Sequence, residues 1–141
     1  MIEIVELRDE YLDAVVEMDE KIFPHSPWGR DSFHNNMINT YDFPVVALKD
    51  GVPAGYGILR QIDAGEILLI GVREEERGQG IGEKICRELL SIANRGENIF
   101  LEVRESNTPA RKMYEKAGFS EIARRRGYYK NPTEDAVIMM I

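Results

Sequence analysis

Residues 72–82 read Val72-Arg73-Glu74-Glu75-Glu76-Arg77-Gly78-Gln79-Gly80-Ile81-Gly82, and this stretch decides the fold. It follows an apolar run, Ile67 to Val72, that is typical of a strand buried on both faces. Beyond it, Ile81, Ile85, Leu89 and Ile92 share one side of a predicted amphipathic helix. Glycines between a strand and a helix let the backbone approach a ligand, and the helix N-terminus adds partial positive charge. We therefore expect a phosphate-binding turn here.

Two better-known phosphate motifs do not fit this turn. A P-loop ends in Gly-Lys-Ser/Thr, whereas Gly82 is followed by Glu83-Lys84. The dinucleotide fingerprint G-x-G-x-x-G, started at Gly78, places Glu83 where the third glycine is required. A nucleotide-binding domain of either kind is therefore disfavoured, and a tight turn that merely tolerates glycine is the alternative. Candidate cations near the turn are Arg73, Arg77, Lys84 and Arg87.

The bulk composition is that of one globular domain, residues 1–141. Hydrophobic residues make up 43% of the 141 residues and charged residues 30%, which suits a single core. The net charge of −7 argues against general nucleic-acid binding. The single cysteine builds no disulfide or cysteine-based metal site, and the sequence lacks a signal peptide and a membrane-length apolar run. We expect a cytoplasmic protein without a metal, a membrane segment or a nucleic-acid partner; its oligomeric state stays open, with a monomer favoured.

Strand and helix patterns alternate along the whole chain. Strands are predicted at Ile2–Leu7, Phe43–Leu48, Val52–Ile62, Ile67–Val72, Ile99–Val103, Phe119–Ile122 (extended by Arg124–Tyr129) and Ala136–Ile141. Helices are predicted after an Asp9 N-cap, at Asp31–Ile38, from the glycine turn to Arg95 with Gly96 ending the helix, and from a Thr108 N-cap to Gly118. Asp50-Gly51 predicts a hairpin, and Phe23 to Trp28 a loop. The order indicates a mixed α/β domain.

The chemistry is expected between Leu101 and Tyr114. Glu102 lies mid-strand between apolar residues, where a carboxylate must be paired or used because burying its charge is costly. It is either in a salt bridge, for which Arg104 on the same strand face is a candidate, or a general base. Tyr114 on the apolar helix face is either a core residue or catalytic. If Thr108 caps the helix, the side chain of Asn107 can bind another partner; otherwise it is a turn residue.

The pattern Arg77-x-x-Gly80-x-Gly82 resembles the acetyl-CoA signature of the GNAT superfamily. In that superfamily the pyrophosphate binds the amides of the turn, and the preceding strand splays from its neighbour to pair with the pantetheine arm. The resemblance implies acetyl-CoA binding by Ile70, Gly71, Val72, Arg77, Gly78, Gln79, Gly80, Ile81 and Gly82. It also implies the GNAT acyltransferase fold, a mixed and mostly antiparallel sheet of about seven strands with about four helices and splayed central strands. Gly71 inside the strand fits a bulge or a close approach of the ligand.

A longer block, Leu-Glu-Val-Arg-x-Ser-Asn-x-x-Ala-x-x-x-Tyr-x-x-x-Gly-Phe from Leu101 to Phe119, resembles the ribosomal-protein-alanine N-acetyltransferase family. Arg125 to Tyr129, Glu134-Asp135-Ala136 and Phe23-Pro24 with Trp28 extend the resemblance over nearly the whole chain. It implies that Glu102 is the general base, Tyr114 the general acid and Asn107 a coenzyme contact. The implied reaction is direct acetyl transfer to the α-amine of a protein N-terminus, with alanine of a small-subunit ribosomal protein as the leading acceptor. Cys86, His25 and His34 receive no role.

Two other functions stay open at this point. One is a GNAT enzyme that acetylates a small amine or a lysine side chain: Tyr128 and Tyr129 favour a peptide-clamping hairpin, but aromatic pairs also arise from ordinary cross-strand packing. The other is a non-catalytic acetyl-CoA sensor, against which the presence of both Glu102 and Tyr114 argues. The connection Lys130 to Thr133 is shorter than we expect for bacterial family members, so a broader N-terminal specificity also stays open.

Overall fold

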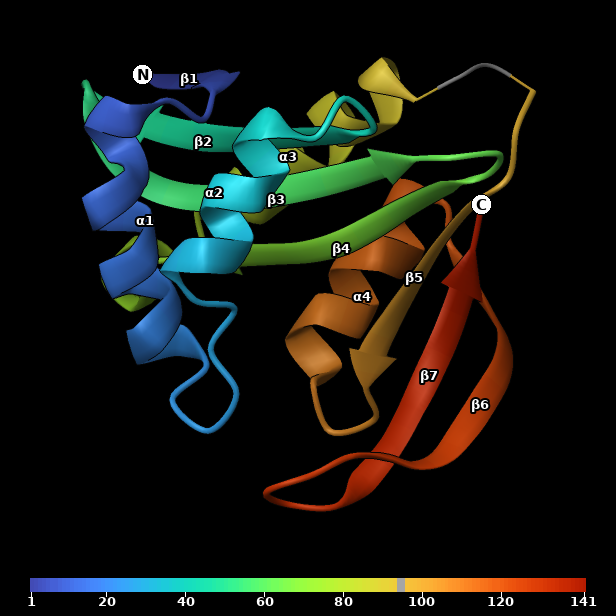
Figure 1. Cartoon of the computed structure of the whole chain (residues 1–141). Helices are drawn as coiled ribbons and strands as arrows, with labels where there is room; N and C mark the ends of the chain where they lie inside the picture. The colour runs from blue at the N-terminus through green and yellow to red at the C-terminus, as the bar shows by residue number, and fades with distance from the viewer. Residues whose placement is uncertain (94–95) are drawn as a thin grey trace.

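The computed structural model describes residues 1–93 and 96–141, and Figure 1 shows one mixed sheet flanked by helices. In chain order, the elements of the described residues are β1 (Ile2–Glu6), α1 (Asp9–Ile22), α2 (Arg30–Ile38), β2 (Asp42–Lys49), β3 (Val52–Gln61), β4 (Gly65–Val72), the 3-10 turn η1 (Glu74–Glu76), α3 (Ile81–Ile92), β5 (Ile99–Arg104), α4 (Thr108–Ala117), β6 (Ser120–Tyr129) and β7 (Glu134–Met140). No helix in these two ranges is long and apolar enough to span a bilayer.

The seven strands form a sheet in the order β1-β2-β3-β4-β5-β7-β6, in which only β4 and β5 pair in parallel. That parallel contact is short and ends at the pair Ile67–Leu101. Beyond it, β4 continues along β3 to Val72 while β5 continues along β7 to Arg104. The two central strands therefore diverge in the middle of the sheet, and the predicted GNAT fold with splayed strands is confirmed.

A bulge in β4 lies immediately beyond this last pair. Ile58 of β3 faces Leu69 and Leu59 faces Ile67, so Leu68 is the extra residue. A bulge bends its strand and increases the local twist, which helps β4 turn away from β5. The sequence suggested either a bulge or a close approach of a ligand at Gly71, and the bulge lies at Leu68 instead.

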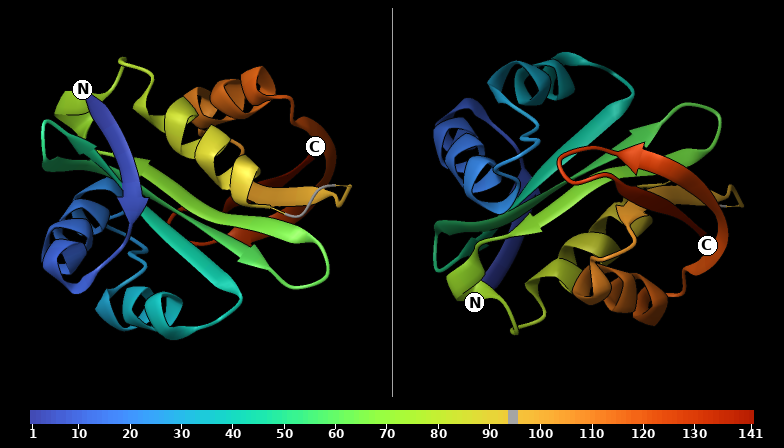
Figure 2. Two further views of the ribbon diagram at one scale, coloured as in Figure 1. Left: turned by 90° about the horizontal axis from the view of Figure 1, so that it is seen from above. Right: turned by 90° about the horizontal axis from the view of Figure 1, so that it is seen from below.

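Helices cover both faces of the sheet, with α1 and α2 on one side and α3 and α4 on the other (Figure 2). The first pair buries apolar residues of α1 and α2 against β2 and β3, including Val15, Phe33, Val46, Tyr56 and Ile58. The second pair packs against the other face, where the core contains Ile85, Leu89, Leu101, Val137 and Met139. The alternation of buried residues along each strand follows from the two-residue period of side chains in a sheet.

The Asp50-Gly51 hairpin is confirmed: both residues have positive φ, 52° and 84°, as a tight primed turn requires. Three helix ends differ from the prediction. Asp9 is the first helical residue of α1 and Arg8 the N-cap. Helix α3 ends at Ile92 because Ala93 is extended (ψ 151°), so Gly96 does not end it, and Arg95 lies outside the described residues. The third end, at Thr108, concerns the site.

Candidate functional site

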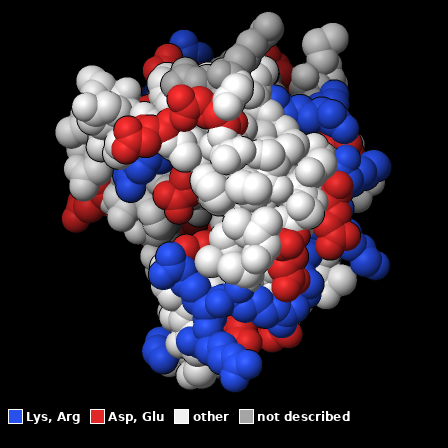
Figure 3. All heavy atoms as spheres, turned by 90° about the vertical axis from the view of Figure 1, so that its right-hand side faces the viewer, with Lys and Arg blue, Asp and Glu red and all other residues white. Residues whose placement is uncertain are grey.

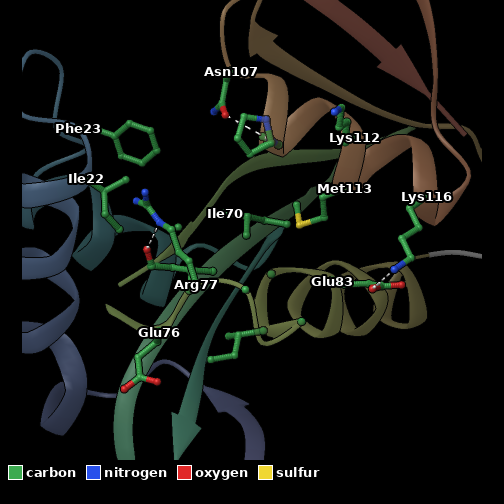
Figure 4. Close-up of a pocket in the computed structure, with 18 residues that line it drawn as sticks. Ile22, Phe23, Ile70, Glu76, Arg77, Glu83, Asn107, Lys112, Met113 and Lys116 are labelled. Atoms are coloured by element: carbon green, nitrogen blue, oxygen red, sulfur yellow. Dashed lines mark hydrogen bonds and ion pairs between the residues drawn. The ribbon is translucent and has the colours of Figure 1, made fainter. Parts of the chain in front are cut away.

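A cleft of about 600 Å³ lies between the glycine turn, the end of β4 and the start of α4 (Figure 4). It is lined by Ile22, Phe23, Ile70, Gly71, Val72, Glu76, Arg77, Gly78, Gly80, Ile81, Gly82, Glu83, Asn107, Pro109, Ala110, Lys112, Met113 and Lys116. Every predicted cofactor residue except Gln79 belongs to this lining. The Gln79 side chain instead donates a hydrogen bond to Glu76 Oε2 at 3.0 Å.

The glycine turn offers bare backbone to this cleft. Gly78 and Gly80 have φ of 81° and 80°, a conformation that side-chain-bearing residues rarely adopt, and a Cβ at either position would meet no atom within 4 Å. Gly80 is also the N-cap of α3, so the partial positive charge of the helix end adds to the exposed N–H groups. The neighbouring Ile81 is buried in the core and lends only its backbone to the turn. The turn therefore has the shape and polarity of an anion cradle.

Gly71 and Gly82 are needed for packing. A Cβ on Gly71 would lie 2.5 Å from the Tyr56 ring, and one on Gly82 would lie 2.7 Å from Met113 Sδ. Gly71 thus makes room for a core tyrosine, which the sequence interpretation of a bulge or ligand approach did not foresee. Gly82 lets α4 come close to the start of α3, which narrows the cleft between them.

The cations at the cleft differ partly from the predicted set. Arg77 lines the cleft and donates from Nε to the Val72 carbonyl at 3.1 Å. Two lysines of α4, Lys112 and Lys116, were not predicted because they follow the turn by some thirty residues in sequence. Of the other predicted cations, none lines the cleft: Arg73 donates to the Pro53 carbonyl, Arg87 to Glu83 at 2.9 Å, and Lys84 is exposed.

A second pocket, of about 240 Å³, adjoins this cleft where β4 and β5 diverge. Its lining comprises Asp19, Phe23, Ser26, Trp28, Leu68, Leu69, Ile70, Glu102, Val103, Arg104, Asn107, Ala110, Tyr114 and Tyr129. Phe23, Ile70, Asn107 and Ala110 line both cavities. The two cavities therefore meet at the gap between the splayed strands, and both predicted catalytic residues line the smaller cavity.

Glu102 and Tyr114 reach the second pocket from different faces of the sheet. Leu101 and Val103 are buried against α3 and α4, so the intervening Glu102 points to the opposite face. Tyr114 projects from α4 into the core on the helix-covered face. Both line one pocket because the gap between β4 and β5 connects the two faces.

The Tyr114 hydroxyl is suited to be a proton donor. The residue is 6% exposed, and burial raises the pKa of its phenol well above the ordinary value, so it stays protonated at neutral pH. Its ring packs edge-on against Phe119 with centroids 5.8 Å apart, which fixes its orientation. Burial likewise raises the pKa of the Cys86 thiol, to about 11, so this cysteine stays a neutral packing residue.

Glu102 is partly exposed and ion-paired, but with a different arginine from the one the sequence suggested. Its Oε1 lies 3.3 Å from Nε of Arg125 in β6. Arg104 is instead bound to Glu134 Oε1 at 3.0 Å and to the carbonyls of Lys130 and Pro132. The hairpin between β6 and β7 supplies several hydrogen-bond acceptors for Arg104 at once. Together they bind Arg104 in preference to the single carboxylate of Glu102 on the same strand.

Asn107, and not Thr108, is the N-cap of α4. Its Oδ1 accepts a hydrogen bond from the backbone N–H of Ala110 at 3.3 Å, and Thr108 is the first helical residue. Asparagine is the better cap of the two. The prediction of Thr108 as the N-cap was therefore wrong. The cap uses only the side-chain oxygen, so the amide nitrogen can still donate to a ligand in either cavity.

The loop between α1 and α2 forms one wall of the second pocket and is anchored by a buried acid that sequence reasoning missed. Asp19 is fully buried and accepts hydrogen bonds from the Tyr56 hydroxyl at 2.8 Å and from the Trp28 backbone N–H. Trp28 Nε1 in turn donates to Asn36 at 2.7 Å. Burial raises the pKa of Asp19 despite these bonds. The sequence did contain a signal for this buried acid, because Asp19 lies four residues after Val15, on the apolar stripe of α1.

Metal chemistry has no candidate ligand cluster here. Within residues 1–93 and 96–141, no group of three or more histidine, cysteine, aspartate or glutamate side chains is placed to hold an ion. What the site does offer is a cradle for an anion, a buried phenol and a carboxylate, all joined through one gap in the sheet.

The family model described as the acetyltransferase (GNAT) family matches residues 5–119. A Bacillus subtilis protein, provisionally named a [ribosomal protein bS18]-alanine N-acetyltransferase, is 37% identical over 139 residues, covering 96% of this chain and 91% of its own. The [ribosomal protein bS18]-alanine N-acetyltransferase of Escherichia coli K12 is 32% identical over 121 residues, covering 82% and 80%.

The same relationship appears in three dimensions. The crystal structure of the ribosomal-protein-S18-alanine N-acetyltransferase from Escherichia coli superposes with a TM-score of 0.86 at 29% identity, over 100% of this chain and 93% of that one. Sequence and fold agree along nearly the full length of both proteins. The chain belongs to the acetyltransferase (GNAT) family and, within it, to the ribosomal-protein-alanine N-acetyltransferases.

Proposed function

We propose that this N-acetyltransferase transfers the acetyl group of acetyl-CoA to the N-terminal α-amine of a protein, with the terminal alanine of a small-subunit ribosomal protein as the leading acceptor. The observation that carries the proposal is the junction of two cavities at the splayed strands, with Glu102 and Tyr114 beside it. One cavity suits the coenzyme and the other an amine, and the gap brings the two reactants together.

The residues of the larger cleft fit coenzyme A. The open backbone at Gly78 and Gly80 and the N-terminus of α3 suit the pyrophosphate, and Arg77 and Lys112 supply positive charge around it. Beyond Ile67, the side of β4 that faces β5 has no strand pairing, so backbone groups from Ile70 to Val72 are available to an extended amide-containing arm. Asn107, at the junction, can contact the same arm with its amide nitrogen.

The chain's own residues then account for the proton transfers. When bound, acetyl-CoA supplies a thioester carbonyl as the electrophile. Glu102 takes a proton from the acceptor's ammonium group, either directly or through a water molecule, which frees the nitrogen lone pair for attack. Backbone N–H groups of β4 beyond Ile67 stabilise negative charge on the carbonyl oxygen. Tyr114, kept protonated by burial, gives its proton to the departing thiolate. The nitrogen loses its second proton after the attack, this proton replaces the one that Tyr114 gave up, and Glu102 releases its own proton to solvent.

The acceptor pocket is walled by elements suited to a peptide. The anchored loop around Trp28 lies on one side, and Tyr129 of the β6–β7 hairpin on the other. Tyr129 packs edge-on against Tyr128, with centroids 5.1 Å apart, and Arg104 lies 4.6 Å from its ring centroid, so this wall is rigid. The related Escherichia coli enzyme is named for alanine acetylation of ribosomal protein bS18, which supports a protein N-terminus as the acceptor.

The test is to incubate the purified protein with acetyl-CoA and a peptide that begins Ala-Arg and contains an internal lysine, and to locate the acetyl group by mass spectrometry. A peptide of the same sequence with a blocked N-terminus is the matched control. Acetylation of the α-amine, lost in the blocked peptide and slowed in Glu102→Gln, is the expected result. Acetyl groups on the lysine alone, or tight acetyl-CoA binding without transfer to any peptide, would overturn the proposal.

A further inference from the structure

The Glu102–Arg125 ion pair places a positive charge beside the carboxylate that we have proposed as the general base. Arg125 belongs to β6 and Glu102 to β5, with β7 between them. Ala136 of β7 pairs with Arg125 of β6 on one side and with Arg104 of β5 on the other, so their three side chains point to the same face of the sheet. Glu102 lies two residues before Arg104 and points to this face as well. Because alanine is short, the Arg125 side chain can reach across β7 toward Glu102.

Arg125 is held much less firmly than its neighbour Arg104. Arg104 binds Glu134 and two backbone carbonyls, whereas among residues 1–93 and 96–141 Arg125 forms one ion pair, to a single Glu102 oxygen at 3.3 Å. The Arg125 side chain is 57% exposed and that of Glu102 23%. An ion pair with this much solvent contact is weak, so another cation can readily replace the guanidinium.

The Arg125 guanidinium has a second contact besides Glu102. Its central carbon is 5.6 Å from the centroid of the Tyr128 ring, and Tyr128 is braced by Tyr129. An arginine over an aromatic face is stabilised without a carboxylate. The side chain therefore retains one favourable contact when another cation takes its place on Glu102.

The charges around Glu102 favour occupation by a cation. Glu66 of β4 adds a second carboxylate: burial and the charge of Glu102 raise its pKa, while Arg60 and Arg125 act in the opposite direction. Arg60 is itself bound through two nitrogens to Asp42, at 2.8 and 3.0 Å. Arg125, which lacks such a bidentate partner, acts on both carboxylates. Figure 3 shows that Lys and Arg side chains gather at the lower end of one side of the molecule, with Asp and Glu side chains among them.

We propose that Arg125 is a positioning residue that occupies Glu102 until the acceptor's ammonium group displaces it, and so keeps the base from activating water. This inference rests on the proposed role of Glu102. The ammonium carries the same charge as the guanidinium and enters the pocket that Glu102 lines. On displacement, Arg125 gives up Glu102 and keeps its contact with Tyr128.

The reaction that Arg125 suppresses is hydrolysis of acetyl-CoA. A pocket of about 240 Å³ has room for several water molecules. If Glu102 removes one proton from such a water, a C–O bond forms to the acetyl carbon and the C–S bond breaks. Tyr114 protonates the thiolate, Glu102 and the acetic acid each release a proton to solvent, and solvent restores the proton of Tyr114. The products are acetate, free coenzyme A and one proton, with no acceptor consumed.

The experiment measures free coenzyme A released from acetyl-CoA without any peptide, by chromatography, for wild type, Arg125→Gln, Arg125→Lys and Arg125→Gln/Glu102→Gln. Arg126→Gln is the matched control, because it removes the same charge from the next residue of the same exposed strand. We expect hydrolysis to rise about tenfold in Arg125→Gln, a small part of what a general base supplies. Arg125→Lys and Arg126→Gln should stay near the wild-type rate, and the double variant should lose the increase.

Steady-state transfer to the Ala-Arg peptide completes the test. Arg125→Gln should leave the peptide KM unchanged or lower, because a competitor for Glu102 has been removed. Hydrolysis by Arg125→Gln that is no faster than that of wild type would overturn the inference. An increase that persists in the double variant, which lacks Glu102, would also overturn it, because water would then be entering a loosened pocket. If wild type transfers no acetyl group to peptide amines, the proposed function fails; if it does and Arg125→Gln hydrolyses no faster, only the inference fails.

Discussion

Glu102 and Tyr114 line the same pocket although Glu102 points to one side of the sheet and Tyr114, in α4, lies on the other. In a continuous sheet, a strand side chain and a helix side chain placed in this way would be separated by the backbone layer. Here the parallel pairing of β4 and β5 ends at Ile67–Leu101, and the gap beyond it joins the two faces. The divergence of two strands thus allows a base and an acid to act on one reaction from opposite directions.

Replacement of Glu102 by glutamine should lower kcat for the Ala-Arg peptide by about 10²- to 10⁴-fold, the usual contribution of a general base. The α-ammonium loses its proton with a pKa of about 7.7–8.0, so more of the peptide is already unprotonated at higher pH. The variant should therefore recover part of its rate between about pH 7 and 9. Initial rates across this range check the prediction, and a variant as fast as wild type at neutral pH would place the base elsewhere.

Tyr114→Phe should slow transfer by about 10²-fold while leaving the fold intact. The phenol is the proposed proton donor to the thiolate, and the ring that packs on Phe119 is retained. The measurements are kcat and the thermal midpoint of the same preparation. Activity should fall with little change in the midpoint. A large loss of stability with unchanged kcat would instead identify Tyr114 as a core residue alone.

The features that the sequence predicts well are those set by local patterns. The glycine turn, the strand before it and the helix after it appear where the period of apolar residues put them. The Asp50-Gly51 hairpin is also predicted from a local pattern, because few residues other than glycine, asparagine and aspartate adopt positive φ. Glu102 and Tyr114 could be singled out because a charge within a strand and a tyrosine in a matching block are visible in the sequence itself; they line one pocket, and their catalytic roles stay a prediction.

The missed features depend on contacts between distant segments. The partner of Glu102 is Arg125, twenty-three residues away across an intervening strand, and no local pattern favours it over Arg104. Lys112 and Lys116 line the larger cleft because α4 packs close to α3, an approach that Gly82 permits. The interpretation of Gly71 considered only its own strand, yet the side chain of Tyr56 leaves no room for a larger residue at this position. Contacts of this kind between distant segments can be identified only when the packing of the chain is known.

Gly71→Ala should destabilise the protein by about 1–3 kcal/mol, the usual cost of overpacking a core. The added methyl group would lie 2.5–2.7 Å from three Tyr56 ring and hydroxyl atoms, and Tyr56 is fixed by its hydrogen bond to Asp19. Urea unfolding measures this change. Gly78→Ala is the comparison, because a Cβ there meets no atom within 4 Å and any cost comes from the backbone conformation. Equal stability of Gly71→Ala and wild type would show that Tyr56 moves freely.

Asp42→Asn should make the protein less stable at neutral pH, by about 2 kcal/mol, because it removes charge-assisted hydrogen bonds from a buried carboxylate. Burial opposes ionisation of Asp42, but the hydrogen bonds from Arg60 and Asn36 outweigh it and hold the pKa below the ordinary value of 3.8. A depressed pKa means that the folded state releases this proton more readily than the unfolded state. The stabilisation is therefore present above about pH 4 and lost as the pH falls through the folded-state pKa.

The stability difference between wild type and Asp42→Asn isolates this effect. Asp19 has a raised pKa, so its contribution changes with pH in the opposite direction, but it is present in both proteins and cancels in the difference. Urea unfolding at a series of pH values from about 6 to 3 should show a gap that is constant at the upper end and narrows below about pH 4. A gap that stays constant to the lowest pH would mean that the Asp42–Arg60 interaction is not linked to ionisation, and that the loss in the variant comes from packing.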